Sequence, residues 1–314
     1  MVRKRFFISL TVCLFCLSWV PLTTGYCDDQ DSGLPAAHII KNVPWHQQIN
    51  GLTCGAGSLE IIFDYYGEDI RQKEIADVAR TSSSGTWAPD IVRAGHFSIL
   101  SSAQGSFYPH DVPEAGFEER AIGYAAFSHN SNELWLKELK NLIANDIPVI
   151  VLMKYTPDGS VGHYRVVIGY DDIQGQIYFS DTWGRDIKRL FIEPGVISWS
   201  YEDFQQGWNY TEYGTEYPYF GAVILPWNIT LNTQEDIVPG SEFTVEASIT
   251  YPCPAPMDTT KFPAKNVIAH IELPDGMQLI EGRYDESIDD LQAGGTAEVT
   301  WKVKVSGEIG RAHV

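Results

Sequence analysis

The chain has little positive charge. Its 314 residues include 22 Lys and Arg against 41 Asp and Glu, which gives a formal net charge of −19 at pH 7. This excess of negative charge argues against nucleic acid or an anionic lipid surface as a partner. The chain also lacks internal repeats and low-complexity tracts, and 44% of its residues are hydrophobic. That fraction is enough to bury ordinary globular cores.

Long hydrophobic runs are missing too, apart from one near the N-terminus. Basic residues at positions 3–5 precede the apolar segment Phe6–Val20, which is short for a membrane span. Small residues follow, ending at Gly25. This pattern predicts a secretory signal peptide over residues 1–25, with an uncleaved anchor as the alternative. We therefore expect an exported protein (periplasmic, cell-envelope or extracellular), with no membrane insertion after cleavage.

Cysteine is scarce, with five in the whole chain, and two of these lie inside the predicted signal. The other three are Cys27, Cys54 and Cys253, an odd number for an exported protein, so at least one free thiol is expected. Cys27 and Cys253 either pair with each other or both stay free. Cys54 is then the thiol whose presence needs a chemical explanation.

Residues 26–40 form a polar lead-in, and residues 41–226 mix helical and strand patterns. Gly55–Tyr66 and Asn132–Asn145 have apolar positions at helical spacing, whereas "PVIVLMKY", Pro148–Tyr155, has the pattern of a buried strand. One helix that carries a cysteine, followed by an antiparallel sheet, predicts an α+β fold. Further short helices are expected at Glu74–Ala79, at Pro89–Ala94 within a long excursion over residues 81–130, and at Ser200–Trp208. Further strands are expected at Tyr164–Tyr170, Gln176–Ser180, Arg189–Glu193 and Ala222–Leu225.

Residues 227–307 have a different character. Apolar and polar residues alternate strictly over 243–249, 267–271 and 297–305, and turn clusters separate these segments. The pattern predicts a small all-β sandwich. Residues 308–314 match the translation of a common sequencing adapter, so we expect them to be an artefact and the sandwich to be incomplete.

Cys54 stands at the start of the first helix, in "QINGLTCGAGSLEIIFDYYG". A thiolate is the nucleophilic form of cysteine, and a helix N-terminus lowers the pKa of a thiol placed there. Acyl transfer by a thiol also requires an imidazole that holds and returns the proton. A carboxylate or amide must orient that imidazole, and hydrogen-bond donors must stabilise the developing oxyanion.

The sequence contains a candidate for each of these roles. His163 begins a strand and Asp181 follows the next strand after a tight turn, so a hairpin can bring the two side chains together. Gln48, six residues before Cys54, can supply a side-chain N–H to an oxyanion. His96 is a rival base in a loop. The remaining histidines show no paired spacing, so neither a metal nor a cofactor is expected.

These motifs resemble the C39-type cysteine peptidases, papain-like domains known best from bacteriocin exporters. Gln48 and Cys54 in the first phrase, His163 in "GHYRVVIGYDD" and Asp181 in "YFSDTWG" carry the resemblance, over residues 40–225. It implies a papain-like fold with Cys54 as nucleophile and His163 as base. It also implies Asp181 as the orienting carboxylate and Gln48 as the oxyanion donor. Residues 227–307 resemble, generically, the Ig-like domains of exported bacterial proteins.

Three functions agree with the sequence. The first is an exported cysteine peptidase that hydrolyses peptide bonds, with a peptide or protein substrate. The second is an amidase or acyltransferase that uses the same thiol chemistry on cell-envelope amides. Asp181 argues against the cell-wall amidases that have a histidine as third residue. The third is a non-catalytic peptide-binding module, against which the presence of Cys54 counts. The sequence makes no prediction of the oligomeric state.

Overall fold

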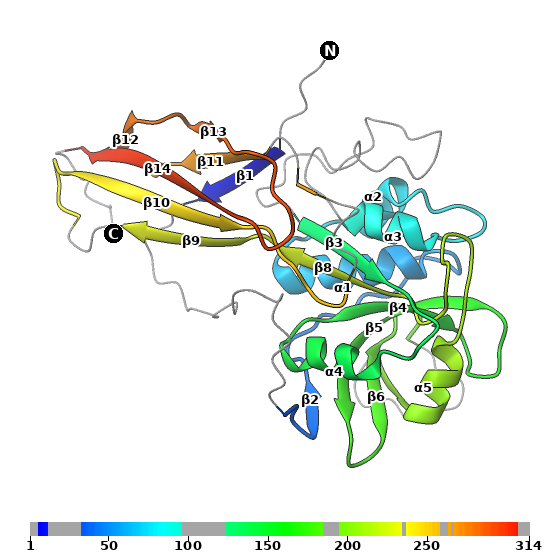
Figure 1. The fold of residues 1–314 in the computed structure, drawn as a ribbon. Helices are drawn as coiled ribbons and strands as arrows, with labels where there is room; N and C mark the ends of the chain where they lie inside the picture. The colour runs from blue at the N-terminus through cyan, green and yellow to red at the C-terminus, as the bar shows by residue number, and fades with distance from the viewer. Residues whose placement is uncertain are drawn as a thin grey trace, which may run out of the picture.

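A seven-stranded antiparallel sheet with helices on both faces forms the larger part of the protein, and two smaller sheets form the rest (Figure 1). The computed structural model describes residues 33–95, 124–184, 195–233, 237–257, 263–264 and 267–306, and the backbone of residues 6–11.

In the large sheet every pairing is antiparallel. Its central strands are apolar on both faces because helices cover both, so they appear in the sequence as continuous apolar runs rather than as alternation. The strand order is β3 (Tyr124–His129), β8 (Gly221–Pro226), β4 (Val149–Lys154), β5 (Gly162–Asp171), β6 (Gln176–Ser180) and β7 (Val196–Ser200), and β2 (Ala37–Ile39) pairs with β5.

Side chains of the large sheet divide between two cores. On β4, Ile150 and Leu152 face one core, whereas Val149, Val151 and Met153 face the other. This division follows from the alternation of side chains along a strand. The first face packs against α1 (Cys54–Tyr66), α2 (Gln72–Val78) and α3 (Ala88–Gly95), and the second against α4 (Leu136–Ala144) and α5 (Tyr201–Trp208).

The hairpin of β5 and β6 brings together residues far apart in the chain. The two strands pair around a turn at Gly175, which has a φ of 65°. Glycine adopts this left-handed conformation without steric cost. Val166 lies opposite Ser180. Arg165, one residue before Val166, therefore lies beside Asp181, one residue after Ser180. His163 lies two residues before Arg165 on β5, so its side chain is on the same face of the sheet.

Two smaller sheets form the C-terminal part. Inward residues such as Val245, Trp301 and Val303 are buried, whereas their neighbours along the strands are more exposed, as the alternation predicts. The strand orders are β12 (Met277–Glu281), β14 (Thr296–Val305), β10 (Glu242–Thr250) and β9 (Asn228–Thr233) in one sheet, and β1 (Phe6–Thr11), β11 (Val267–Glu272) and β13 (Asp285–Ser287) in the other. β1 lies within the predicted signal and pairs in parallel with β11.

The small sheets share a hydrophobic core with the α4 and α5 face of the large sheet. Tyr251 joins the two parts, since its ring centroid lies 5.7 Å from that of Phe127 and 4.7 Å from that of Trp227. Phe127 belongs to β3 of the large sheet, and Tyr251 follows β10. The core of the protein is therefore continuous across the boundary at residue 226.

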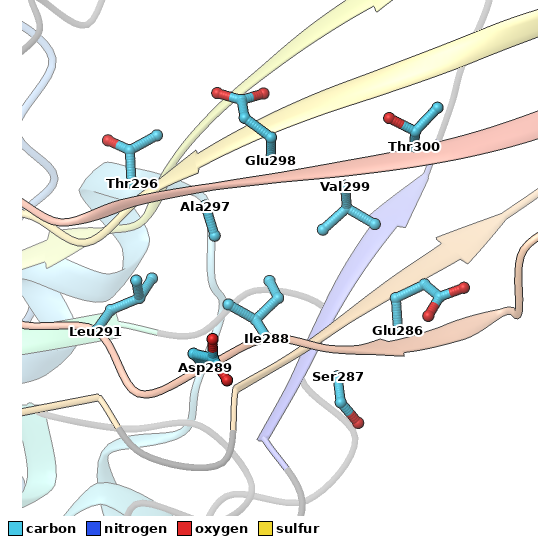
Figure 2. A pocket seen from close by; sticks show the side chains of 10 residues that line it. All are labelled: Glu286, Ser287, Ile288, Asp289, Leu291, Thr296, Ala297, Glu298, Val299 and Thr300. Carbon is cyan, nitrogen blue, oxygen red and sulfur yellow. The ribbon is translucent and has the colours of Figure 1, made fainter.

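A hollow of about 670 Å³ opens between β14 and the segment that follows β13. Figure 2 shows Ala297 and Val299 of β14 directed toward Ile288. The carboxyl group of Glu286 lies on the same side as Ile288. This hollow belongs to the C-terminal sheets and has no residue of α1, β5 or β6 in its lining.

Several sequence predictions need correction. Residues 81–130 are not only an excursion with a short helix, because β3 lies inside them. The lead-in likewise contains β2, and β7 was also not predicted. All three of these strands are short, so each gives only a weak pattern in the sequence. The helix expected from Asn132 begins only at Leu136, because Trp135 is buried against Gly221 and its indole N–H donates to the Tyr219 carbonyl. The strand expected at Arg189–Glu193, the rival base His96 and residues 308–314 lie outside the described residues.

Candidate active site

The loop before α1 is held by its own hydrogen bonds. The Asn50 N–H donates to Thr53 Oγ1 over 3.2 Å, and the Leu52 N–H donates to Asn50 Oδ1 over 2.8 Å. The helix then begins, with the Gly57 N–H bonded to the Thr53 carbonyl at 2.8 Å. Cys54 is therefore the first residue of the helix, where backbone N–H groups without helical partners stabilise a negative charge.

Glycines in the first turn of α1 let other segments approach closely. A Cβ atom on Gly55 would lie 2.8 Å from both Thr86 Cβ and Ile91 Cδ1. On Gly57 it would lie 3.0 Å from Thr182 Cγ2. The segment after β6, which carries Asp181, thus packs directly on the turn that carries Cys54.

Cys54 and His163 lie close enough for each side chain to shift the pKa of the other. Burial raises the pKa of the Cys54 thiol, whereas the His163 side chain lowers it. Backbone hydrogen bonds from Tyr164 and Gly55 act in the same direction, and the pKa lies below its ordinary value. The environment of Cys54 therefore favours the thiolate, which is the reactive form.

Asp181 orients the imidazole. His163 Nε2 lies 3.1 Å from Asp181 Oδ1, which also accepts the Trp183 N–H at 2.8 Å. Nε2 faces the carboxylate, so Nδ1 is the ring atom left for Cys54. Burial lowers the pKa of His163, but the charge of Asp181 raises it above the ordinary value, against an opposing effect of Arg165. Burial also disfavours the Asp181 carboxylate, yet Arg165 and His163 hold the pKa of Asp181 well below its usual range.

Arg165 is a buried cation beside this carboxylate that the sequence analysis missed. Its side chain is 2% exposed, and its Nε donates to Asp181 Oδ2 over 2.6 Å. Nη1 and Nη2 donate to the carbonyls of Lys154 and Tyr155 over 3.2 and 2.9 Å. The guanidinium carbon lies 4.7 Å from the ring centroid of Trp199. The sequence did contain one signal for this role, a charged residue inside the apolar run "HYRVVIGY". A buried charge in a protein is paired, so this arginine could have been predicted to have an acidic partner.

Gln48 joins the cluster through Thr182. The Gln48 N–H donates to the Thr182 carbonyl over 2.8 Å, and Thr182 Oγ1 donates to Gln48 Oε1 over 2.8 Å. Gln48 Nε2 donates to the Asn50 carbonyl over 2.6 Å. Because a carbonyl only accepts, this bond determines which end of the amide is the NH₂ group. The structure thus brings all four sequence-predicted residues into one connected cluster.

The other histidines that the structure describes are not part of this cluster. His38 and His46 bond to Asp146 and Asp64, each over 2.8 Å. Among the described residues, no three His, Cys, Asp or Glu side chains are grouped to hold a metal ion. Trp199 and Trp208 are core residues, each at most 1% exposed.

The cysteines divide into two kinds. Cys253 is disulfide-bonded, and its partner lies outside the described residues. Cys54 is free. In the described part of the chain Cys54 is thus the one free thiol, in agreement with the expectation from the odd number of cysteines. In that same part, no helix has the length and the hydropathy that a membrane crossing requires.

A cysteine on a helix, facing a histidine and a carboxylate on an antiparallel sheet, is an arrangement typical of thiol hydrolases. The model of the Peptidase_C39 like family matches residues 40–215. The chain belongs to this family, and the expected papain-like arrangement, an antiparallel sheet with a few helices, is confirmed. No curated protein matches the chain.

Several solved structures of low sequence identity are similar. One is a double glycine motif protease from an AMS/PCAT transporter in complex with the leader peptide, with 16% identity and a TM-score of 0.37, covering 60% of this chain and 94% of that one. The peptidase domain of Streptococcus ComA has 18% identity and a TM-score of 0.37, over 59% and 98% of the two chains. Xylellain, a cysteine protease from Xylella fastidiosa, has 15% identity and a TM-score of 0.41, over 71% and 98%.

Proposed function

We propose that the protein is an exported cysteine peptidase that hydrolyses peptide bonds through Cys54, His163 and Asp181. One observation carries the proposal: the free thiol at the start of α1 interacts with an imidazole that a buried carboxylate holds on its other side. Membership of the Peptidase_C39 like family supports the same reaction class.

In the proposed reaction the Cys54 thiolate attacks the carbonyl carbon of the scissile bond, and the His163 imidazolium gives its proton to the leaving amine. The acyl group is then a thioester on Cys54. A water molecule attacks this thioester while His163 takes one of its protons. The acid product leaves, and the thiolate–imidazolium pair is restored. Asp181 stays ionised throughout and fixes the plane of the ring.

The oxyanion of each tetrahedral intermediate needs donors. Gln48 Nε2 has a second N–H besides the one bound to the Asn50 carbonyl. We assign this N–H, together with the Cys54 backbone N–H, to the oxyanion. Thr182 supports the assignment because it fixes the orientation of the Gln48 amide.

Export is the second part of the proposal. The disulfide at Cys253 supports it, because disulfides persist in oxidising compartments outside the cytosol. If residues 1–25 are removed as a signal, N-terminal sequencing of the mature protein will begin at Tyr26. A mature protein that begins at Met1 would contradict cleavage.

A cleavage-site profile on a peptide library tests the reaction. We expect wild type to release new amino termini, and Cys54→Ala and His163→Ala to release none. His270→Ala is the matched control, since His270 Nδ1 lies 2.7 Å from Asp285 Oδ1 in another His–Asp pair, within the C-terminal sheets. This variant retains activity. Products that appear only when a primary amine is added would instead indicate an acyltransferase. The absence of any product would favour a non-catalytic peptide-binding module.

A further inference from the structure

The carboxylate of Asp181 serves two cationic partners. Oδ1 lies against His163 Nε2 and accepts the Trp183 N–H, whereas Oδ2 accepts from Arg165 Nε. We propose that Arg165 is a positioning residue of the active site, which fixes the Asp181 carboxylate and balances its charge at His163. This inference rests on the proposed function.

The geometry allows Asp181 a single orientation. A rotation of the carboxyl group that improved one of its three hydrogen bonds would lengthen another, because two donors are held on β5 and the third is the backbone N–H of Trp183. Bonds to charged groups are also about twice as strong as neutral ones. The orientation of the imidazole is therefore set by the guanidinium as well as by the carboxylate.

Arg165 is itself held in place. Its Nη atoms donate to the carbonyls of Lys154 and Tyr155, at the end of β4, and its guanidinium carbon lies over the ring of Trp199 on β7. Arg165 and His163 belong to the same strand, and both side chains are buried. The partner of the histidine is thus tied to the strand that carries the histidine.

Charge gives Arg165 a second role. Four described ionisable groups face His163: Cys54 from α1, Asp181 after β6, Arg165 on β5, and Tyr155 after β4, whose ring centroid lies 5.3 Å away. With the thiolate and imidazolium formed, Arg165 makes the cluster neutral. Without it, a buried carboxylate acts unopposed on the imidazolium, which then holds its proton more tightly.

The test uses the full-length protein and needs no peptide substrate. The rate of alkylation of Cys54 by iodoacetamide is measured against pH by mass spectrometry of the Cys54 peptide, with Cys54→Ala as the blank. The profile has two steps, one for formation of the thiolate and one for loss of the imidazolium proton. Arg165→Met is expected to shift the upper step by about one pH unit to higher pH. Arg165→Lys keeps the charge and leaves the step near its wild-type position.

Asp181→Asn separates positioning from charge. This variant leaves a buried guanidinium without its carboxylate, so its Tm is expected to fall well below that of wild type. The double variant Arg165→Met/Asp181→Asn removes both charges and is expected to recover most of that loss. Arg80→Met is the matched control, because Arg80 Nε bonds to Asp90 Oδ1 over 2.9 Å in another part of the protein. Arg80→Met is expected to leave the alkylation profile unchanged, whatever it does to Tm.

Two results would overturn the inference. One is an Arg165→Met variant that folds and has the wild-type alkylation profile, which would reduce Arg165 to a packing residue. The other is a double variant no more stable than Asp181→Asn. Both readouts concern the thiol and the fold, so a failure to cleave peptides would count against the proposed function and not against Arg165.

Discussion

Thr182 offers a sharp test of the oxyanion assignment. Its hydroxyl donates to Gln48 Oε1, and both side chains are buried, with Gln48 5% and Thr182 0% exposed. Thr182→Val keeps the shape of the side chain and removes the donor. Gln48 Oε1 then loses its partner inside the protein, which costs about 1–3 kcal/mol. The amide relieves this cost by rotating, and its second N–H no longer points at the oxyanion.

The expected kinetic effect follows from that rotation. Complete loss of one oxyanion donor lowers kcat by about 10²–10³-fold, and this is the expectation for Gln48→Ala. A mispositioned donor loses part of the effect, so Thr182→Val is expected to lower kcat about tenfold, or about 1.4 kcal/mol, with little change in KM.

The assay is steady-state cleavage of one peptide by wild type, both single variants and the double variant. Because Thr182 acts through Gln48, the double variant is expected to be no slower than Gln48→Ala alone. Thr250→Val, in the C-terminal sheets, is the control and leaves kcat unchanged. Additive losses in the double variant, or an unchanged kcat in Thr182→Val, would refute the argument.

Three further predictions follow from the site and its surroundings. Since the pKa of Cys54 is lowered chiefly by His163, alkylation stays fast below the ordinary thiol pKa in wild type, whereas His163→Ala requires higher pH; identical profiles would contradict this. Burial raises the pKa of Glu212 from 4.5 to about 7, so the folded state holds a proton that the unfolded state has lost, and this group's contribution to stability falls as pH rises between those values. In Glu212→Gln that part of the pH dependence of Tm is absent. Gly57→Ala pushes a Cβ against Thr182 and lowers stability by about 1–3 kcal/mol, as chemical denaturation can show, whereas Ala at the open position Gly33 has no such effect.

The sequence predicted the residues whose chemistry and position along the chain both give a signal. Cys54 stood at a helix start, and one hairpin joined His163 to Asp181, whereas the link between the thiol and that hairpin came from the resemblance to C39-type peptidases. Thr182 acts through a contact with Gln48, 134 residues away in the chain, and Arg165 acts through the face of β5 on which its side chain lies. Their roles depend on which way each strand faces, and that is set by the register of β5 and β6, including the shift between Val167 and Gly169.

The fold was predicted best where burial is complete. β4 and α1 gave strong apolar patterns, and both were found close to their expected bounds. β9, β12 and β13 were not predicted, because these strands are half exposed and carry polar residues on both faces. Their pairing depends on neighbouring strands rather than on their own sequences. The Ig-like character of the C-terminal part stays a prediction.

The ring of Tyr251 affects how the protein unfolds. Because it packs on Phe127 and Trp227, neither part can open without exposing apolar surface of the other. We therefore expect calorimetry to record one cooperative melting transition for the whole chain. A shortened protein that ends at Pro226 would carry an uncovered apolar face and would tend to self-associate.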